Sequence, residues 1–487
     1  MPSLSKSRFV AGCQCHDLLW WSVHESDSAE LEPDIALEDL FEQGRQVGKL
    51  AREYVPGGVL IDLPHGDFEG RVRATAEALA AGASVVYEAA FAADDVFVAV
   101  DILERSEGGF TLVEVKSATR AKEDFIPDVA LQTHVVRASG LEVTRQEVMH
   151  LNRECRYPEL GDLFVRADVT EAVADFLPLV PGEIEAQRAM LDGPFPDGGF
   201  GEHCLTAADC PFHDRCWPEL SPEHVLTLYR LSPEKKWALM ERGIESIRDL
   251  ETTQGLPKLA QRQVRAVQAG SRILSKELGT ALAPFAGRLA YLDFETVSLA
   301  IPVWEGLGPW RQMPVQFSVH KEQRPGWPEH HEFLAADGAD CREAMARALI
   351  RACDGADRIV AYNAGFEKSC VNLLAEAVPE LAGELEAVKA KLIDLLPVVR
   401  NYVYDPEFMG SFSLKSVLPA LVPEMGYEDL EIADGMTASW YLARLLFRPE
   451  MVAEGERGEL REKLLEYCKR DTWATVRLLG ELRRVAA

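Results

Sequence analysis

The sequence predicts a mixed α/β protein built from layers of helices and sheets. From residue 288 onward, apolar strand-like segments (LAYLDFETV, MPVQFSVHK, RIVAYN) alternate with helix-like ones such as CREAMARALIRAC. This alternation is typical of helices that cover a sheet. Before residue 220, a strand-rich stretch is flanked by segments with helical periodicity, residues 35–54 and 68–81 among them.

Breaks in the pattern divide the chain into three regions. The polar segment PELSPEH ends the first region near residue 220, and the next stretch has helical periodicity interrupted by Gly243 and Pro257. We therefore predict a first domain over 1–220, a small helical connector over 221–285 and a second α/β domain over 286–487. A length of 487 residues fits about three units of roughly 150 residues each.

Composition narrows the function classes. No run approaches the roughly 18 apolar residues of a membrane span, and the opening segment lacks the features of a signal peptide. We expect a cytoplasmic protein without a membrane partner. The net charge of −28 argues against a protein that coats nucleic acid through a basic surface. It leaves room for enzymes whose carboxylates hold divalent cations. The candidates for a local basic track, or simply for solvated surface charges, are Lys6, Arg8, Arg120, Lys122, Lys469 and Arg470.

A first group of candidate catalytic residues surrounds a predicted hairpin. Asp101 follows the apolar segment VFVAV, and after a Gly-Gly turn the strand FTLVEVK carries Glu114 and Lys116. Residues two apart on a strand share one face. Asp101 and Glu114 are therefore candidate ligands of Mg²⁺ or Mn²⁺, and Lys116 a candidate to orient water or stabilise a phosphate. Glu88 is a further carboxylate in reach of this group.

Cysteines form a second group. Cys15 precedes the hairpin region, and Cys204, Cys210 and Cys216 follow it with five residues between successive members. In a reducing compartment such clusters indicate metal rather than disulfides. Four thiolates suit a 4Fe-4S cluster or a structural zinc ion, and buried free thiols remain the alternative. Cys13 is the alternative to Cys15, and His203 and His213 are substitute ligands if the metal is zinc.

A third group lies in the second domain. The strand LAYLDFETV carries Asp293 and Glu295 on one face, and Glu367 follows the strand RIVAYN. Tyr467 and Asp471, four residues apart, share one face of a C-terminal helix. Paired carboxylates repel one another unless a cation lies between them, and two divalent ions could activate water and stabilise a leaving oxygen.

The order D-x-E, N-x-x-F-(D/E), Y-x-x-x-D resembles the DnaQ-like DEDD exonucleases of the tyrosine subtype, which have an RNase H-like fold. The resemblance implies that Asp293, Glu295, Glu367 and Asp471 bind metal, that Tyr467 positions the attacking water, and that cleavage runs 3′ to 5′. That family usually has aspartate where this chain has Glu367. Asp394 is a possible substitute, although a capping or solvent-facing role is the other interpretation.

The first region resembles the RecB-like PD-(D/E)XK nucleases, restriction-endonuclease-like in fold, in its Asp101 and Glu-x-Lys residues. Gln132 resembles the glutamine of the helix that follows the Glu-x-Lys strand in that family. The Fe-S members place cysteines before and after the core, which favours iron-sulfur and Cys15 here. Members often carry a histidine in an early helix, near the place where this chain has Gly48.

The phrases YLDFET, YNAGFEK, GSFSLKSVLPAL and EYCKRDT, joined to the cysteine-flanked module, resemble a bacterial domain family of unknown function that pairs the two nuclease types. The resemblance implies a metal-dependent nuclease, an exonuclease, with DNA preferred over RNA as its partner. Gly48 and Glu367 favour the alternative of a nucleic-acid-binding protein with one or both sites inactive. An RNA exonuclease and an Fe-S sensor are the remaining alternatives.

Overall fold

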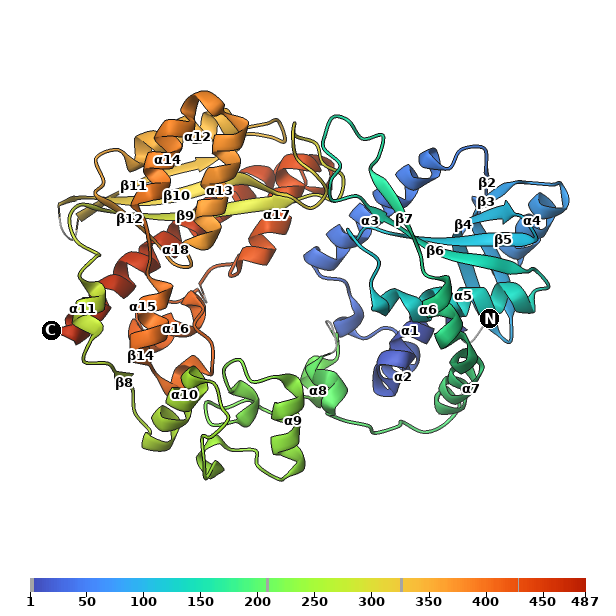
Figure 1. Ribbon diagram of the computed structural model, residues 1–487, viewed down its shortest axis with the longest axis horizontal. Coiled ribbons are helices and arrows are strands. Elements are labelled where there is room, and N and C mark those ends of the chain that lie inside the picture. The colour runs from blue at the N-terminus through green and yellow to red at the C-terminus, as the bar shows by residue number, and fades with distance from the viewer. Residues whose placement is uncertain (1–3, 207–209, 325–326, 428) are drawn as a thin grey trace. The chain divides into compact units, whose positions relative to one another are not determined.

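The computed structural model describes residues 4–206, 210–324, 327–427 and 429–487. The chain forms two compact units (Figure 1). Unit 1 comprises Met1–Trp217 with Leu299–Arg311, and unit 2 comprises Pro218–Ser298 with Gln312–Ala487. Helices and strands are mixed in both units, as expected for an α/β protein. The segment predicted as a separate connector, 221–285, groups with unit 2. Within the described ranges, no helix has the length and apolar character needed to cross a membrane.

Unit 1 is built on a seven-stranded mixed sheet of order β2-β3-β4-β5-β6-β7, with β1 paired to β4. The hairpin strands β3, β4 and β5 are antiparallel, whereas β5 and β6 are parallel and are connected through helix α5. The strands are β1 (Leu4–Ser5), β2 (Val59–Leu60), β3 (Val85–Ala93), β4 (Val96–Ser106), β5 (Gly109–Lys116), β6 (Val143–Leu151) and β7 (Phe164–Asp168).

The core of unit 1 forms where α5 packs on this sheet. The buried side chains of Val129, Leu131 and Val135 join apolar residues of β3, β4 and β5 in one cluster, as expected for a strand region that is covered by helices. The helices are α1 (Lys6–Gln14), α2 (His16–His24), α3 (Ile35–Tyr54), α4 (Phe68–Ala80), α5 (Ile126–Ala138), α6 (Thr170–Phe176), α7 (Val180–Leu191) and α8 (His213–Cys216).

Unit 2 contains a five-stranded sheet of order β11-β10-β9-β12-β13. Strands β9, β10 and β11 are antiparallel neighbours, and β12 and β13 run parallel to β9. Helices α12, α13 and α14 lie on one side of the strands, and α17 and α18 lie on the other (Figure 1). The strands are β9 (Leu289–Ser298), β10 (Gln312–Arg324), β11 (Trp327–Leu334), β12 (Arg358–Ala361) and β13 (Leu392–Asp394).

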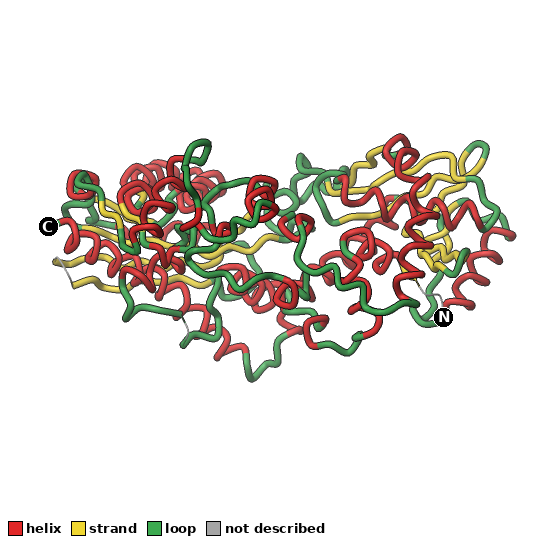
Figure 2. The backbone as a smooth tube through the Cα atoms, turned by 90° about the horizontal axis from the view of Figure 1, so that it is seen from below, coloured by secondary structure: helices red, strands yellow, loops and turns green. Residues whose placement is uncertain are grey.

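Figure 2 shows that the strands of each unit gather into one layer with helices around it. The helices of unit 2 that follow the connector are α12 (Arg342–Cys353), α13 (Gly365–Ala377), α14 (Ala382–Lys391), α15 (Leu396–Tyr402), α16 (Leu414–Leu421), α17 (Gly435–Phe447) and α18 (Arg457–Ala486). The long helix α18 contacts both β9 and β10. It therefore brings residues near the C-terminus next to the first strand of the sheet.

The connector has a small core of its own and is fixed to the rest of unit 2. Val225, Leu228 and Val264 are among its buried residues. Its elements are a 3-10 helix (Val225–Thr227), α9 (Pro233–Glu241), α10 (Lys258–Ala269), β8 (Ile273–Leu274) and α11 (Leu278–Leu282). Strand β8 pairs with β14 (Val403–Tyr404). The guanidinium of Arg262 donates to the backbone carbonyls of Arg400 and Asn401.

Candidate active sites and cysteine site

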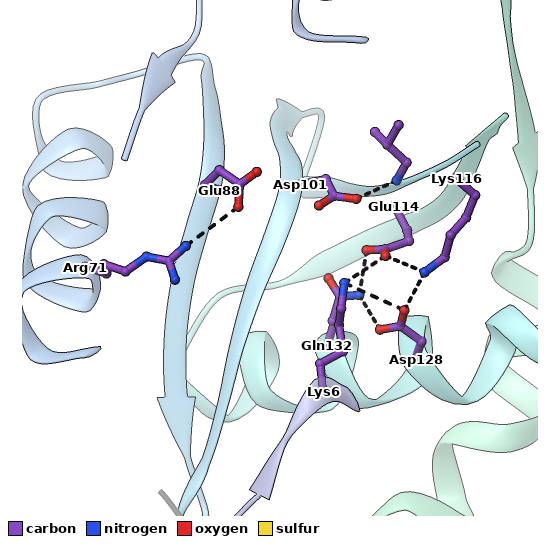
Figure 3. Close-up of polar contacts among 9 residues, drawn as sticks. Lys6, Arg71, Glu88, Asp101, Glu114, Lys116, Asp128 and Gln132 are labelled. Carbon is purple, nitrogen blue, oxygen red and sulfur yellow. Dashed lines mark hydrogen bonds and ion pairs between the residues drawn. The ribbon is translucent and has the colours of Figure 1, made fainter. Parts of the chain in front are cut away.

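The β4–β5 hairpin brings the first group of predicted residues together in unit 1. Ile102 pairs with Val113, so Asp101 lies across from Glu114 on the neighbouring strand (Figure 3). The Asp101 carboxylate accepts a hydrogen bond from the backbone N–H of Val115 at 2.7 Å. Gln132, on α5, donates to Glu114 at 2.8 Å. Two neighbouring strands and the helix that covers them therefore place the four predicted residues, Lys116 included, in one site.

Glu114 is 2% exposed and is surrounded by donors. One of its oxygens, Oε1, accepts from Lys116 Nζ at 2.7 Å and from Lys6 Nζ at 2.8 Å. The other oxygen, Oε2, accepts from Gln132. Asp128 completes the network, because Lys116 and Gln132 each donate to it at 2.8 Å. Figure 3 shows Lys6 reaching this cluster from the start of α1.

Two members of this network are not predicted by the sequence. Lys6 is expected there only as a surface cation, but it lies against Glu114 because β1 pairs with β4 and α1 begins directly after β1. That pairing joins segments about 90 residues apart, so no local pattern indicates it. Asp128, in contrast, could have been predicted from the sequence by its spacing. It lies four residues before Gln132 on a helix, and residues four apart share a face.

The two carboxylates Asp101 and Glu114 of the unit 1 site have pKa values shifted in opposite directions. Burial and the nearby carboxylate of Glu114 raise the pKa of Asp101 to about 8. Burial alone would also raise the pKa of Glu114, but Lys6 and Lys116 hold it below its usual range. Asp101 therefore keeps a proton near neutral pH when no cation is bound. A divalent ion at Asp101 would displace that proton, so the residues present fit a metal here.

Glu88 lies on β3, next to Asp101 on the neighbouring strand β4. Its φ is +56°, and the residues on either side of it pair with β4, Tyr87 with Ile102 and Ala89 with Val100. Its carboxylate contributes to the raised pKa of Asp101 and is 3.7 Å from the guanidinium of Arg71 (Figure 3). A left-handed φ is uncommon for a non-glycine residue.

The third group of predicted residues converges in unit 2. Asp293 and Glu295 lie on β9, Glu367 lies in the first turn of α13, and Tyr467 and Asp471 lie on α18. Burial, followed by the charge of Asp471, raises the pKa of both Asp293 and Glu295 well above the usual range. The Glu367 carboxylate also contributes to both shifts. The four carboxylates are therefore close enough to repel one another.

Glu367 is 2% exposed, and burial raises its pKa to about 8. Within the described chain, its Oε2 atom has no hydrogen-bond partner, and a buried polar atom without a partner is costly. A cation between Glu367 and the β9 carboxylates would relieve both this cost and the repulsion, so these residues fit a metal.

Asp394, the possible substitute for Glu367, has a capping role, because its Oδ1 accepts from the backbone N–H groups of Asn363 and Leu396, each at 3.0 Å.

Three neighbours add to the chemistry of the unit 2 site. The Cys468 thiol is 3.6 Å from Asp293 Oδ2, and with Asp293 and Glu295 it offers ligand atoms within 4.8 Å of one another. Tyr427 donates to Asp471. Lys415 lies over the rings of Tyr427 and Tyr467, 5.4 Å from each centroid, and its charge lowers the pKa of Glu295 and Asp471. Tyr427 is not predicted by the sequence, because no spacing links it to Asp471.

The four predicted cysteines line one cavity of about 400 Å³ in unit 1. Cys15 lies between α1 and α2, and its apolar surroundings include Leu18, Trp21 and Phe212. Cys13 is on α1 instead, where its sulfur accepts from Gln187 at 3.6 Å. His203 Nε2 is 3.4 Å from Cys204 Sγ. The structure thus places Cys15 rather than Cys13 with Cys204, Cys210 and Cys216.

The spacing of these thiols bears on the metal. Among the described residues, no three of the four sulfurs lie within 4.8 Å of one another, in contrast to the Asp293, Glu295 and Cys468 atoms. A single tetrahedral Zn²⁺ with bonds of about 2.3 Å would need sulfurs about 3.8 Å apart. As placed among the described residues, the four thiols therefore do not form a closed tetrahedral zinc site.

The loop of residues 299–311 groups with unit 1, although β9 and β10 on either side of it belong to unit 2. Trp304 is 3% exposed, and Trp310 Nε1 donates to the Ser117 carbonyl at 2.5 Å. The backbone of Leu307 and Gly306 bonds to that of Tyr157. The burial of Trp304 and the hydrogen bond of Trp310 indicate that these aromatic residues pack within unit 1.

Comparison with known proteins gives one match. A family model described as a domain of unknown function (DUF2779) matches residues 290–413. No similarity was found to curated proteins or to solved structures. The matched segment covers about a quarter of the chain and includes Asp293, Glu295 and Glu367 but not Tyr467 or Asp471. Over this segment the chain is similar to a family whose function is unassigned.

Proposed function

We propose that this protein is a metal-dependent nuclease that trims or degrades nucleic acid from an end, with DNA preferred over RNA. The observation that carries the proposal is the group of Asp293, Glu295, Glu367 and Asp471. These carboxylates come from β9, α13 and α18, and in the described chain none of them forms an ion pair with a lysine or arginine. Burial is the main cause of their raised pKa values, and mutual repulsion adds to it for Asp293 and Glu295; divalent cations would relieve both.

In unit 2, Asp293, Glu295, Glu367 and Asp471 would hold Mg²⁺ or Mn²⁺. Such ions, when bound, activate water and stabilise the leaving oxygen in phosphodiester hydrolysis. Tyr467 is buried beside Asp471 and hydrogen-bonds to it. Burial and the surrounding carboxylates raise the pKa of Tyr467 far above its usual range, so its hydroxyl stays protonated. Its proton is donated to Asp471, and its oxygen can accept a hydrogen bond from a water molecule and so help to orient it.

The topology of unit 2 supports an RNase H-like DEDD exonuclease. Its sheet has three antiparallel strands followed by two parallel ones, and the carboxylates lie on the first strand and on the helix against it. The glutamate at position 367 sits about one helical turn beyond the end of β12 and reaches the same cluster. Its longer side chain is thus compatible with the aspartate role of that family.

Unit 1 is proposed as a RecB-like PD-(D/E)XK module. Asp101 and Glu114 would hold one divalent cation, and Lys116 would contact the phosphate. An alternative function for this unit has a specific basis: Glu114 already accepts hydrogen bonds from Lys6, Lys116 and Gln132. A carboxylate with most of its lone pairs occupied is a weaker metal ligand. Unit 1 could then grip nucleic acid while unit 2 cleaves it.

A 4Fe-4S cluster is the proposed occupant of the cysteine cavity, held by Cys15, Cys204, Cys210 and Cys216. The support is the shared cavity, its apolar lining and the separation of the sulfurs. The cluster would link the start of unit 1 to its end. A structural role of this kind needs no redox change during catalysis.

The decisive experiment compares the anaerobically purified protein with Asp101→Asn, Asp293→Asn and the double variant on 3′-labelled and 5′-labelled single strands. Matched DNA and RNA are incubated with Mn²⁺ or Mg²⁺. We expect Asp293→Asn to abolish stepwise release from the 3′ end, because it removes a central ligand. Glu107→Gln, on the exposed turn of the β4–β5 hairpin, is the matched control and should cleave like wild type.

The outcomes separate the two functions. Degradation that survives Asp101→Asn and vanishes in Asp293→Asn supports catalysis by unit 2 with a binding role for unit 1. If degradation is lost only in the double variant, the result supports two active sites. If wild type binds both strands and leaves them intact with either ion, the nuclease proposal is wrong and the binding alternative replaces it.

A further inference from the structure

A cavity of about 530 Å³ in unit 2 opens onto the acidic site. Asp293 and Asp471 form one part of its wall, and Arg400 and Lys415 form another. The connector supplies the adjacent residues Tyr229 and Arg230. The segment expected mainly to join two domains therefore lines the same cavity as the candidate catalytic carboxylates.

Three cations of this cavity are available to bind an anion. The chain has 79 acidic and 51 basic residues, and many of its arginines are paired with a carboxylate. Within the described residues, Arg230, Arg400 and Lys415 form no ion pair with any acidic side chain. Beside the carboxylates Asp293 and Asp471, the cavity therefore offers three charged donors that can bind an anion.

Several contacts hold Tyr229 and Arg230 at this place. The Gln263 side chain accepts from the backbone N–H of Tyr229 at 2.9 Å and donates to the Thr227 carbonyl at 3.0 Å. The Tyr229 ring packs edge-on against Phe412, with 5.0 Å between centroids. Arg230 has a left-handed φ of +51° and lies over the Tyr229 ring at 5.3 Å. Such a backbone conformation is costly for arginine unless the surroundings impose it.

We propose that this cavity binds the terminal nucleotide of a single nucleic-acid strand, with Tyr229 and Arg230 of the connector as the residues that hold its base and its phosphate. The inference rests on the proposed function of unit 2 and deepens it. Arg230, Arg400 and Lys415 would contact phosphates, because guanidinium and ammonium groups donate charged hydrogen bonds to phosphate oxygens. The Tyr229 ring would stack on a base, a contact that every base can make.

The dimensions of the cavity suit a single nucleotide. Its volume falls within the roughly 300–1,000 Å³ typical of sites for small ligands. The aromatic ring and the cations lie together with the carboxylates Asp293 and Asp471. A strand anchored there by its last base would present its final phosphodiester to the acidic group.

The test measures binding without cleavage. Full-length protein in EDTA is titrated with a fluorescent single-stranded DNA and with the matched RNA at several salt concentrations. We expect Arg230→Ala to weaken binding about 5- to 10-fold and to reduce the salt slope by about 1. Tyr229→Ala should weaken binding and leave the slope unchanged. The control is Arg324→Ala, which removes another exposed arginine that lies over an aromatic ring, Trp327, outside the cavity.

Photocrosslinking locates the end of the strand. A strand with 5-iodouracil as its 3′-terminal base should crosslink to Tyr229, whereas the same base placed ten nucleotides inward should not. No binding by wild type, equal affinities of Arg230→Ala and Arg324→Ala, or a terminal crosslink outside the cavity would each overturn the inference.

The same measurements keep this inference distinct from the proposed nuclease activity. If binding and crosslinking occur as expected and Mn²⁺ produces no hydrolysis by wild type, the inference stands and the proposed nuclease activity fails. If Mn²⁺ produces hydrolysis while Arg230→Ala binds the strand as tightly as wild type, the nuclease activity stands and the inference fails.

Discussion

Two lysines set the charge balance of the unit 1 site. Asp101, Glu114 and Asp128 face Lys6 and Lys116, and Lys6 Nζ lies 2.8 Å from Glu114 and 3.7 Å from Asp128. Lys6 is the second positive charge beside Glu114, after Lys116. It occupies space and neutralises negative charge that a second divalent cation would otherwise occupy and neutralise. If the unit 1 site binds divalent ions as proposed, we expect Lys6 to limit their number.

Replacing Lys6 with methionine should change both stability and metal binding. Methionine keeps much of the side-chain volume but leaves the buried Glu114 with Lys116 as its remaining cation. We expect the metal-free protein to lose about 1–3 kcal/mol of unfolding free energy, because removing one partner of a buried pair exposes the other to an unfavourable environment. We also expect unit 1 to bind additional Mn²⁺, measured by equilibrium dialysis or calorimetry.

Lys6→Arg is the matched control, since it retains the charge at the start of α1. It should keep the wild-type number of bound ions and most of the stability. Equal Mn²⁺ binding by wild type and Lys6→Met would show that Lys6 does not occupy a cation position, and its role would then be limited to anchoring α1 against β5.

At the scale of elements, regular spacing predicted the parts of each site that lie on one element. Glu114 and Lys116 are both on β5, and Tyr467 and Asp471 are both on α18. Periods of two on a strand and four on a helix follow from backbone geometry alone. Tyr427 joins the site through tertiary packing, which leaves no periodic trace in the sequence. Tyr229 and Arg230 of the connector line the unit 2 cavity through tertiary packing as well.

One close backbone approach contributes to the attachment of the connector. Gly410 has a φ of +72°, and a Cβ atom there would lie 1.7 Å from the carbonyl oxygen of Thr227. It follows the 3-10 helix Pro406–Phe408, and its N–H donates to the Tyr404 hydroxyl at 3.0 Å. Only glycine allows both the left-handed conformation and this distance.

Gly410→Ala should therefore separate the connector from the rest of unit 2. The left-handed backbone costs about 1–2 kcal/mol for alanine, and the overlap with Thr227 adds to it, so we expect at least about 2 kcal/mol of destabilisation. Denaturant unfolding gives the magnitude, and limited proteolysis should cut residues 218–285 faster.

Gly383→Ala is the control for this substitution. Gly383 lies inside α14, and among the described residues no atom outside its own helical turn lies within 4 Å of the position that an added methyl group would take. The substitution should be neutral or stabilising by up to about 1 kcal/mol. Equal protease resistance of the Gly410 and Gly383 variants would contradict this account of how the connector is held.

At the scale of the whole molecule, the chain is more interwoven than its linear pattern predicts. Residues 299–311 leave unit 2 after β9, group with unit 1 and return to begin β10. Sequence periodicity identifies β9 and β10 as strands, but it cannot say where the loop between them docks. That choice depends on contacts such as those of Trp310 with Ser117 and of Ala300 with Gln43.

The 4Fe-4S cluster proposed for the cysteine cavity would impose a second long-range constraint, because Cys15 is separated from Cys204, Cys210 and Cys216 by roughly 200 residues. Joining such distant positions restricts the unfolded chain and is worth several kcal/mol in the loop-closure model. For a domain of this size, each kcal/mol moves Tm by about 2–4 °C. The link should therefore matter for unit 1 and leave unit 2 unaffected.

Cys15→Ser should lower the Tm of unit 1 by about 5–10 °C and reduce the visible absorption of the anaerobically purified protein. Cys13→Ser should change neither, because Cys13 lies outside the cavity and contacts Gln187. Calorimetry resolves the transitions, and hydrolysis by unit 2 after Cys15→Ser reports whether that unit remains folded. Loss of colour in Cys13→Ser with retention in Cys15→Ser would reverse the ligand assignment, and a colourless wild type that contains zinc would replace the cluster with a metal ion bound by a rearranged set of thiols.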